Sequence, residues 1–530
     1  MRSWAYGVGV DASDASRSRP RYDELLRHGS TFLLVAASVV ALASVALVAV
    51  AHVDDDYGVD HPAGTWIALA RYANGGTLYP PLYDGVAFGG TRYMPVPILL
   101  QAGVERLTGS YVTAGKAISL VALAALLVMI FLLLRRLGCA WPVALALTSS
   151  VPITATGVVA STGIRHDVLP VVLQLGALAL ATRVERPRAV TAAGVLCALA
   201  VAAKLSAVWA PPAIALWLLF QNRRALLRFV GSFAVALGAL FSLFELLSSG
   251  RLGTNIAALG LSGSRREQSL SGALDRYLTI LHDGLGIARL LLALAAIGVV
   301  VALWRRRLTI YHVAYVSALV VLVPVLSDFG TYGNQVVDAY VLAVVVVGIL
   351  WVDARALTAR AGILQLVLVA SVLLVAVVSY RDSFGELDLG AAARQLVGGR
   401  EPPQMRALLA GHIRPGDRIV SENPYVADIL GERPIVLDPY ELQHLASTHP
   451  GWRDDFVRRL DAHEFDAIFL LYRPERWKRY WSVRFWYTRI HFGPEITAAI
   501  IRDYRETGRA AGMWIYRPRP AVAQGYRRGS

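Results

Sequence analysis

Residues 53–76 read VDDDYGVDHPAGTWIALARYANGG, and this stretch decides how the chain is interpreted. It follows a hydrophobic run of about 21 residues, which is long enough for a helix that crosses a bilayer. The segment after the acidic residues is amphipathic, carries Trp66 and ends in two glycines. Carboxylates at the end of a membrane span are costly and are candidates for function. Four of them fall within seven positions: Asp54, Asp55, Asp56 and Asp60.

The composition is typical of a helical membrane protein. Of the 530 residues, 55% are hydrophobic and 17% are charged, whereas a soluble protein carries about a quarter charged residues. We therefore predict a polytopic α-helical membrane protein with about 11 spans, each an apolar run of roughly 20 residues. The spans are expected near 31–51, 111–134, 141–160, 168–182, 189–206, 207–221, 229–248, 286–304, 309–326, 336–352 and 361–379.

Arginine-rich loops alternate with the opposite loops, which include the acidic stretch 52–96. The loops LLRRLG, TRVERPR, QNRRALLRF, WRRRLT and DARALTAR all fall on one side of the predicted spans. Short loops rich in Lys and Arg stay in the cytoplasm. The N-terminus is therefore predicted inside and the C-terminus outside. The net charge of +14 then reflects topology, and no nucleic-acid partner is expected.

The same pattern predicts the domain organisation. Residues 1–29 are expected to be a disordered cytoplasmic tail, and 30–380 a transmembrane domain. The outer loop 52–110 of that domain is expected to hold two surface helices. Residues 381–520 are predicted to form an extracytoplasmic α/β domain, followed by a disordered tail at 521–530.

Strand and helix signals alternate in the C-terminal domain, which predicts a partly parallel sheet. Helix candidates lie at 401–413 and 451–463. The strand candidates are 416–423, 433–438, 465–472 and 512–518.

Polar side chains in or beside spans are functional candidates by default. Lys204 lies in an apolar run, where it either neutralises an anion or snorkels to the interface. Asn334 and Asp338 share a helical face and either shape a ligand pocket or fix helix packing. On this topology the candidates collect at the outer surface: Asp54, Asp55, Asp56, Asp60, Arg92, Arg165, His166, Asp167, Lys204, Asp328, Asn334 and Asp338.

Asp60 differs from the other three aspartates in its local context. Pro62 is favoured in the first turn of a helix, so Asp60 is expected to cap a surface helix that closes at Gly75. An N-cap aspartate is held in place, which suits a catalytic carboxylate and equally a structural cap. The Asp54–Asp56 run is either a solvated turn or a site for a divalent cation, Mg²⁺ or Mn²⁺. No other cofactor is expected.

The order of these features resembles the GT-C membrane glycosyltransferases, especially the relatives of lipid A aminoarabinose transferase and of protein O-mannosyltransferase. It comprises a span, an acidic loop, an amphipathic helix, LYPP, a second Pro-bearing surface helix and a long span ending in Arg-Arg. The stretches STGIRHDVLPVVLQLGALAL and LAVAAKLSAVWAPPAIALWLL also resemble that family. TRYMPVPILL departs from it, because Pro95 stands where relatives carry a lysine and Arg92 precedes it.

The resemblance implies an enzyme that moves a hexosyl or pentosyl group from a polyprenyl-phosphate donor. The acceptor would be a hydroxyl of a cell-envelope glycan, lipid or protein. Asp60 becomes the counterpart of the family's catalytic acidic residue and would act as general base. Fixed cations stabilise the charge that develops on the leaving phosphate, and the candidates for this role are Arg165, His166, Lys204 and Arg92. The pocket is expected to include Asp167, Asn334 and Asp338.

Two other function classes stay open: a transporter or flippase of lipid-linked substrates, and a non-catalytic envelope sensor or scaffold. Transporters place polar groups near the membrane midplane and often contain internal repeats, whereas the polar residues here cluster on one side. A scaffold does not need Lys204 at the end of a span. The Ala-, Arg-, Gly- and Val-rich composition resembles that of high-GC actinobacteria. The expected location is the cell membrane, with the active site and the C-terminal domain outside.

Overall fold

The N-terminal helix is longer than the sequence predicted. α1 (Asp14–Ala51) begins inside the predicted disordered tail, so residues 14–29 are helical. Once a helix has nucleated in the apolar run, each further residue adds a hydrogen bond without a new nucleation cost. Residues 1–13 and the predicted tail 521–530 lie outside the described residues. The structure is a computed structural model that describes residues 14–260, 270–328, 331, 333–355, 361–384, 389–398, 405–479 and 481–520.

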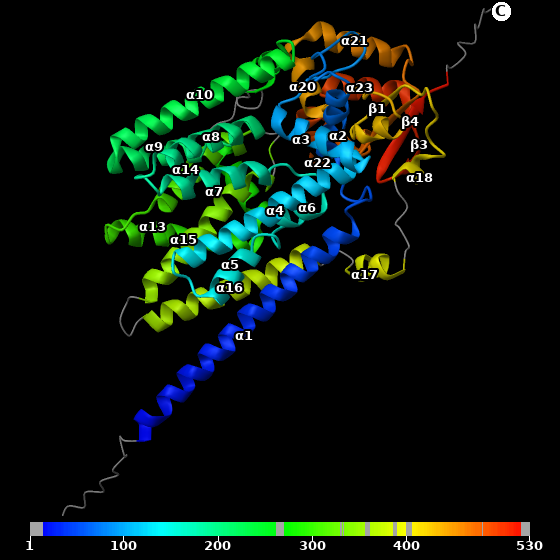
Figure 1. Cartoon of the computed structure of the whole chain (residues 1–530). Helices are drawn as coiled ribbons and strands as arrows, with labels where there is room; N and C mark the ends of the chain where they lie inside the picture. The colour runs from blue at the N-terminus through cyan, green and yellow to red at the C-terminus, as the bar shows by residue number, and fades with distance from the viewer. Residues whose placement is uncertain are drawn as a thin grey trace, which may run out of the picture.

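Most of the chain is a bundle of apolar helices (Figure 1). In the described part of the chain, six helical segments are long and apolar enough to cross a membrane. They lie in α1, α4 (Tyr111–Arg136), α10 (Arg223–Leu247), α12 (Leu270–Leu285) with α13 (Arg289–Trp304), α15 (Val337–Arg355) and α16 (Ala361–Phe384). The shorter apolar helices are α7 (Val168–Ala181), α8 (Pro187–Ala203), α9 (Ala210–Gln221) and α14 (Ile310–Leu326).

The predicted span 141–160 is wrong as a single helix. The structure has α5 (Trp141–Ser149) and α6 (Ala155–Thr162), which are nine and eight residues long. At about 1.5 Å per residue, neither can cross a hydrocarbon core of about 30 Å. Pro152 lies between them and has no amide hydrogen to continue a helix. The side chain of Thr154 caps the new helix instead.

α15 is the centre of the bundle. Within its membrane-length segment 89% of the residues are buried, against 6% for α10. α15 contacts α4, α13, α14 and α16, whereas α10 packs mainly on α8. A helix that is apolar on all sides is typical of such a buried position. The exposed apolar surface of α10 is what a lipid-facing helix presents.

The two ends of the bundle differ in chemistry. α7 begins after Asp167 and ends just before Arg183, while α8 begins after Arg186 and ends at Lys204. α4 likewise begins at the outer loop and ends at Arg136. The Arg-rich connections therefore lie at one end, and Asp167 and Lys204 lie at the other end together with the outer loop.

The outer loop folds into two helices, α2 (His61–Asn74) and α3 (Pro95–Thr108), as predicted. α3 exposes the apolar side chains of Leu99, Leu100 and Leu107, and Leu107 is 88% exposed. Its Gln101 is fully buried and faces the protein. A helix with this arrangement suits the surface of a bilayer.

The C-terminal part contains a four-stranded sheet in the order β1-β2-β4-β3. The strands are β1 (Ile419–Ser421), β2 (Ala467–Leu470), β3 (Tyr504–Ala510) and β4 (Met513–Pro518). β1 and β2 are parallel and the other neighbours antiparallel, so the predicted partly parallel sheet is confirmed. The helices of this part are α18 (Met405–Leu409), α19 (Tyr425–Ile429), α20 (Pro439–Thr448), α21 (Pro450–Asp461), α22 (Trp481–Phe485) and α23 (Pro494–Asp503).

The predicted strand at 433–438 is not part of this sheet, because Val436 pairs with Phe88 of the outer loop. The Phe88 amide donates to Ile435 O at 2.8 Å, and the Leu437 amide donates to Phe88 O at 2.9 Å. Phe88 also belongs to the hydrophobic core of the sheet region. The outer loop and the C-terminal part therefore pack as one unit, and Figure 1 shows both at one end of the bundle.

β3 has no counterpart among the predicted strands. In its sequence YRETGRA only Tyr504 is fully buried, and the six residues after it alternate between exposed and partly buried positions without an apolar run. Such a strand is stabilised by pairing with its neighbour rather than by a hydrophobic pattern.

Candidate active site

Asp60 caps α2 and forms an ion pair with Arg165. One carboxylate oxygen accepts a hydrogen bond from the Ala63 amide at 3.2 Å, so the predicted N-cap is confirmed. The other oxygen accepts from the Arg165 guanidinium. The Asp60 side chain is still 45% exposed, so the carboxylate is accessible from solvent.

The turn that carries Arg165 packs against both α4 and the outer loop. The Arg165 amide donates to the Ser119 hydroxyl of α4 at 2.8 Å. Gly58 has a φ of 72°, and a Cβ at that position would lie 3.2 Å from the carbonyl oxygen of Thr162. Glycine fits both this conformation and this close approach. Two segments that are distant in the sequence are thereby joined at the Asp60–Arg165 pair.

Lys204 and Asp167 form a second ion pair at 2.7 Å. Lys204 is the C-cap of α8 and lies after the helix, not inside the predicted span 189–206. Its side chain is 15% exposed and points to a carboxylate, so it does not snorkel. Asp167 also accepts a hydrogen bond from Asn334. Burial opposes the ionisation of Asp167, but the Lys204 charge and the hydrogen bonds outweigh it and lower the pKa of that carboxyl.

Asp338 joins this second pair from the start of α15. The indole nitrogen of Trp209 donates to Asp338 at 2.9 Å. Asp338 also interacts electrostatically with Lys204 and Asp167. Asn334 lies in a 3-10 turn (Gly333–Val336) and Asp338 lies in α15, so the two residues do not share one regular helix as predicted. Both nevertheless meet the Asp167–Lys204 pair.

His166 is buried and neutral. Gln101 donates through Nε2 to Tyr111 O at 2.9 Å, so its Oε1 is an acceptor. His166 Nε2 lies 3.0 Å from that oxygen and must be the donor. Burial lowers the pKa of His166 to about 4. The ring packs edge-on against Trp66, 4.8 Å between centroids. A neutral ring held in this way supplies no positive charge to a phosphate, which was the role expected of it.

Arg92 lies in a separate ion cluster. Its guanidinium pairs with Asp328 and, at 2.6 Å, with Glu441 of α20. It also stacks over the ring of Tyr440, whose hydroxyl donates to Asp328 at 2.5 Å. Burial raises the pKa of Glu441 to about 8. The donors of Arg92 are thus engaged in joining the outer loop to the C-terminal part, and the structure does not bring Arg92 to the Asp60–Arg165 pair.

The three aspartates of the Asp54–Asp56 run point to different partners. Asp55 is buried and pairs with His52 at 2.6 Å and with Lys116 at 3.2 Å. Asp56 accepts from the Met405 amide, and Asp54 is exposed. In the part of the chain that the structure describes, no three His, Cys, Asp or Glu side chains are grouped to hold a metal ion. The geometry therefore does not support a cation site in this run.

Lys116, Glu422 and His491 are absent from the predicted site residues. Lys116 is a lysine in an apolar run, the same signal that singled out Lys204. Glu422 and His491 pair at 2.6 Å, and the His491 ring lies 5.1 Å from that of His61. No local pattern marks this pair, because its members are 69 residues apart in the sequence.

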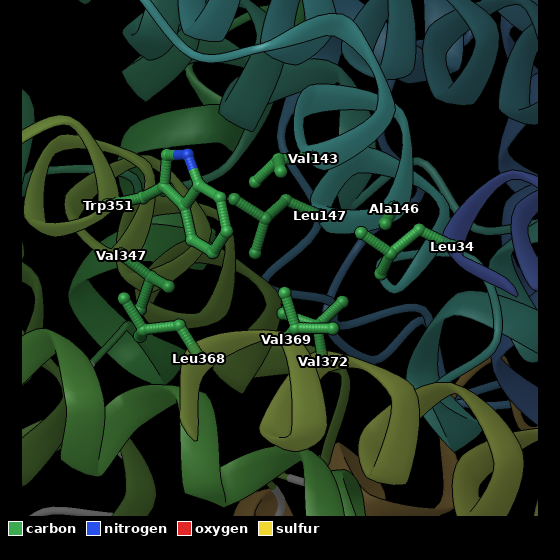
Figure 2. Close-up of a pocket in the computed structure, with 9 residues that line it drawn as sticks. All are labelled: Leu34, Val143, Ala146, Leu147, Val347, Trp351, Leu368, Val369 and Val372. Carbon is green, nitrogen blue, oxygen red and sulfur yellow. The ribbon is translucent and has the colours of Figure 1, made fainter. Parts of the chain in front are cut away.

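A cavity inside the bundle lies apart from these residues (Figure 2). Its volume of about 10 Å³ is comparable to one water-sized sphere, so it cannot hold a sugar. It is lined only by apolar and aromatic side chains: Leu34, Val143, Ala146, Leu147, Val347, Trp351, Leu368, Val369 and Val372.

The fold is shared with a solved membrane enzyme, although no family model and no curated protein matches the chain. ArnT from Cupriavidus metallidurans, bound to undecaprenyl phosphate, superposes with a TM-score of 0.55 at 12% identity. The match covers 90% of this chain and 97% of that one. The apo structure of the same enzyme gives 0.54 at 13% identity, with the same coverage. The chain therefore has the fold of ArnT, the lipid A aminoarabinose transferase, which confirms at the level of the fold the predicted resemblance to the GT-C membrane glycosyltransferases.

Proposed function

We propose that the chain is a membrane glycosyltransferase that moves a sugar from a polyprenyl-phosphate donor to an acceptor hydroxyl of the cell envelope. The observation that carries this proposal is the accessible Asp60 carboxylate, fixed at a helix start beside the Arg165 guanidinium. The shared fold with ArnT, which was crystallised with undecaprenyl phosphate, supports a lipid-linked donor.

Asp60 is the general base in this proposal. The acceptor oxygen attacks the anomeric carbon of the sugar, and its proton passes to the carboxylate. The bond between that carbon and the phosphate oxygen breaks, and polyprenyl phosphate leaves with the electron pair. A carboxylate placed to accept the proton contributes about 10²–10⁴-fold to the rate.

Arg165 and Lys204 bind the donor phosphate. An arginine offers two parallel N–H donors to phosphate oxygens, and a lysine offers a compact charge. Apart from its ion pair with Asp167, the buried Lys204 Nζ has no hydrogen-bond partner among the described residues. Asp167 pairs with this ammonium, Asn334 donates to Asp167, and Asp338 adds a second negative charge nearby.

The phosphate competes with Asp60 for Arg165. In the structure each cation is paired with a carboxylate, Arg165 with Asp60 and Lys204 with Asp167. When a phosphate takes the Arg165 guanidinium, Asp60 loses its ion-pair partner and is free to accept a proton. Donor binding therefore activates the base, so that the carboxylate acts only when the sugar is present.

The reaction is proposed to take place on the outer face of the membrane. The ion pairs lie at the end of the bundle opposite to the Arg-rich connections. Short Arg-rich loops stay in the cytoplasm, so the opposite end faces outward.

The test uses the purified full-length chain in lipid nanodiscs with a panel of hexosyl and pentosyl polyprenyl phosphates. Mass spectrometry should detect release of polyprenyl phosphate from at least one donor, and Asp60→Asn should lower this release about a hundredfold or more. Wild-type release by Asp60→Asn would refute the assignment of the base. Movement of an unchanged donor across the bilayer, without release, would identify a flippase instead.

A further inference from the structure

The two chain neighbours of Asp60 are both held by the C-terminal domain. Asn423 donates through Nδ2 to the carbonyl oxygen of Val59 at 2.9 Å. On the other side, the rings of His61 and His491 meet edge-on with centroids 5.1 Å apart. The Asp60 carboxylate makes neither of these contacts, which hold the residue before it through its backbone and the residue after it through its ring.

The Asn423 side chain is held in a single orientation. It is 4% exposed, and its Oδ1 accepts from the Tyr425 amide at 3.1 Å. This leaves the Nδ2 group for Val59, which is itself buried. α2 approaches so closely that a Cβ on Gly64 would lie 2.3 Å from Asn423 Oδ1. The amide is therefore enclosed between the start of α2 and the segment that follows β1.

His491 is anchored by a buried carboxylate. Its Nδ1 lies 2.6 Å from Glu422 Oε1, and both residues are almost fully buried. Glu422 also accepts hydrogen bonds from the Trp486 indole at 2.8 Å and from the Tyr487 hydroxyl at 3.0 Å. The Trp486 ring packs against His491 at 4.4 Å. The imidazole is thus fixed by its hydrogen bond to Glu422 on one side and faces the His61 ring on another.

One strand end supplies both anchors. Glu422 and Asn423 are consecutive residues directly after β1, and the Glu422 amide donates to Phe469 O of β2 at 3.0 Å. The parallel pairing of β1 with β2 therefore fixes where Glu422 and Asn423 lie relative to the outer loop. Side chains at the end of a strand are placed more rigidly than side chains on a loop.

We propose that Asn423 and His491 are positioning residues that keep the Asp60 carboxylate at the position required for the reaction. This inference rests on the proposed role of Asp60 as base. Neither residue touches the carboxylate; they act through Val59 and His61. A displacement of about 1 Å at a reacting group can lower a rate about a hundredfold, so this fixation gives the C-terminal domain a direct part in catalysis.

The variants Asn423→Leu and His491→Leu test the proposal, because each keeps most of the side-chain volume. The first removes the hydrogen bond to the Val59 carbonyl oxygen, and the second removes the ring that contacts His61. Turnover is measured per donor-binding site, counted with a labelled sugar polyprenyl phosphate, so that unfolded protein does not contribute. We expect kcat to fall about ten- to a hundredfold while the KM for the donor changes less than threefold. The control is Arg433→Gln, which breaks the half-exposed pair with Asp84 and should leave kcat unchanged.

A double-mutant cycle with Asp60→Glu separates positioning from a general structural effect. The longer side chain of Asp60→Glu already displaces the carboxylate. Adding Asn423→Leu to that variant should therefore lower kcat by a much smaller factor than Asn423→Leu lowers it in the wild type. Full additivity, or wild-type kcat in both single variants, would overturn the positioning role. If either of those results is found while Asp60→Asn is inactive in the same assays, the proposed function stands and only the positioning role is refuted. If Asp60→Asn turns over normally, the base assignment itself is wrong.

Discussion

Asp60 and Arg165 are 105 residues apart in the chain and form an ion pair at the first turn of α2. The pair joins the outer loop to the turn between α6 and α7, and it lies beside the second pair, Asp167 and Lys204. Each carboxylate therefore has a cation next to it, and in the proposed reaction that cation would pair with the donor phosphate instead. The contributions of Arg165 and Lys204 to donor binding can therefore be tested one at a time.

Replacement of Arg165 by Ala should raise the KM for the donor and lower kcat, together about a hundredfold or more, because the phosphate loses a bidentate partner. Arg165→Lys should recover part of the loss, since it restores the charge without the planar fork. Both are measured as kcat and KM for a sugar polyprenyl phosphate. Equal activity in Arg165→Ala and wild type would exclude contact between this residue and the donor.

Lys204→Met should weaken donor binding about tenfold or more. It should cost less stability than the loss of a fully buried pair, because Lys204 and Asp167 are 15% and 20% exposed and methionine fills the space of the lysine stem. Polyprenyl phosphate without a sugar should lose inhibitory strength by the same factor, since the shared phosphate is the group recognised. The matched variant is Lys116→Met, which removes a buried lysine from the Asp55 pair and should lower thermal stability instead. An unchanged inhibition constant in Lys204→Met would remove Lys204 from the phosphate site.

His166→Gln should lower kcat/KM less than tenfold. The pKa of His166 is lowered to about 4 by burial, so the ring is neutral throughout the range from pH 5 to 8. The variant should therefore have the same pH–rate profile as the wild type in that range, measured as donor turnover. A profile that loses an inflection in the variant would mean that His166 carries a catalytic proton.

Asp55 should stabilise the fold at neutral pH and lose this effect in acid. Burial opposes its ionisation, but the His52 hydrogen bond and the Lys116 charge outweigh it and lower its pKa from 3.8 to about 2. The unfolded chain therefore binds its proton at higher pH than the folded one. The contribution, about 1–2 kcal/mol, is present above pH 4 and lost as the pH falls through 2. Asp55→Asn should thus lower the thermal midpoint at pH 7, with a difference from wild type that shrinks between pH 4 and 3.

Gly64→Ala should loosen the C-terminal domain from α2. Its Cβ would lie 2.3 Å from Asn423 Oδ1 and 2.8 Å from the Tyr425 amide nitrogen, so neighbouring atoms must shift at a cost of about 1–3 kcal/mol. Gly103→Ala on α3 is the control, because no atom lies within 4 Å of its added Cβ and alanine is a better helix former. Thermal unfolding should separate the two variants. Equal stability would mean that α2 is not held against the segment after β1.

Much of the fold follows from local rules that act over a few residues. Asp60, Pro62 and Gly75 bound α2 because capping and backbone geometry are local properties. The prediction of a single span at 141–160 is wrong for a related, local reason. The residues are largely apolar, but Pro152 interrupts the helix. β3 is missed because a partly exposed strand obtains its stability from pairing with β4, which no short window of sequence contains.

The candidate site is predicted in part. Asp167, Lys204, Asn334 and Asp338 are recognised as polar groups beside spans, and the structure brings them together. Arg92 is also a charged residue at the predicted outer surface, but it pairs with Asp328 and Glu441. The sequence could not predict this, because the charge of a residue does not indicate which partner lies opposite it in the fold.

By itself, the sequence determined that the chain is a helical membrane protein with its acidic loop and its Arg-rich loops at opposite ends, and that Asp60 opens a surface helix. Hydrophobic length, loop charge and helix capping suffice for this, since each depends on neighbouring residues only. The tertiary structure alone decided that Arg165 faces Asp60 and that Asn423 holds Val59, across 364 residues. These contacts depend on how whole helices and a sheet pack, and packing is set by the summed shape of many side chains rather than by any local pattern.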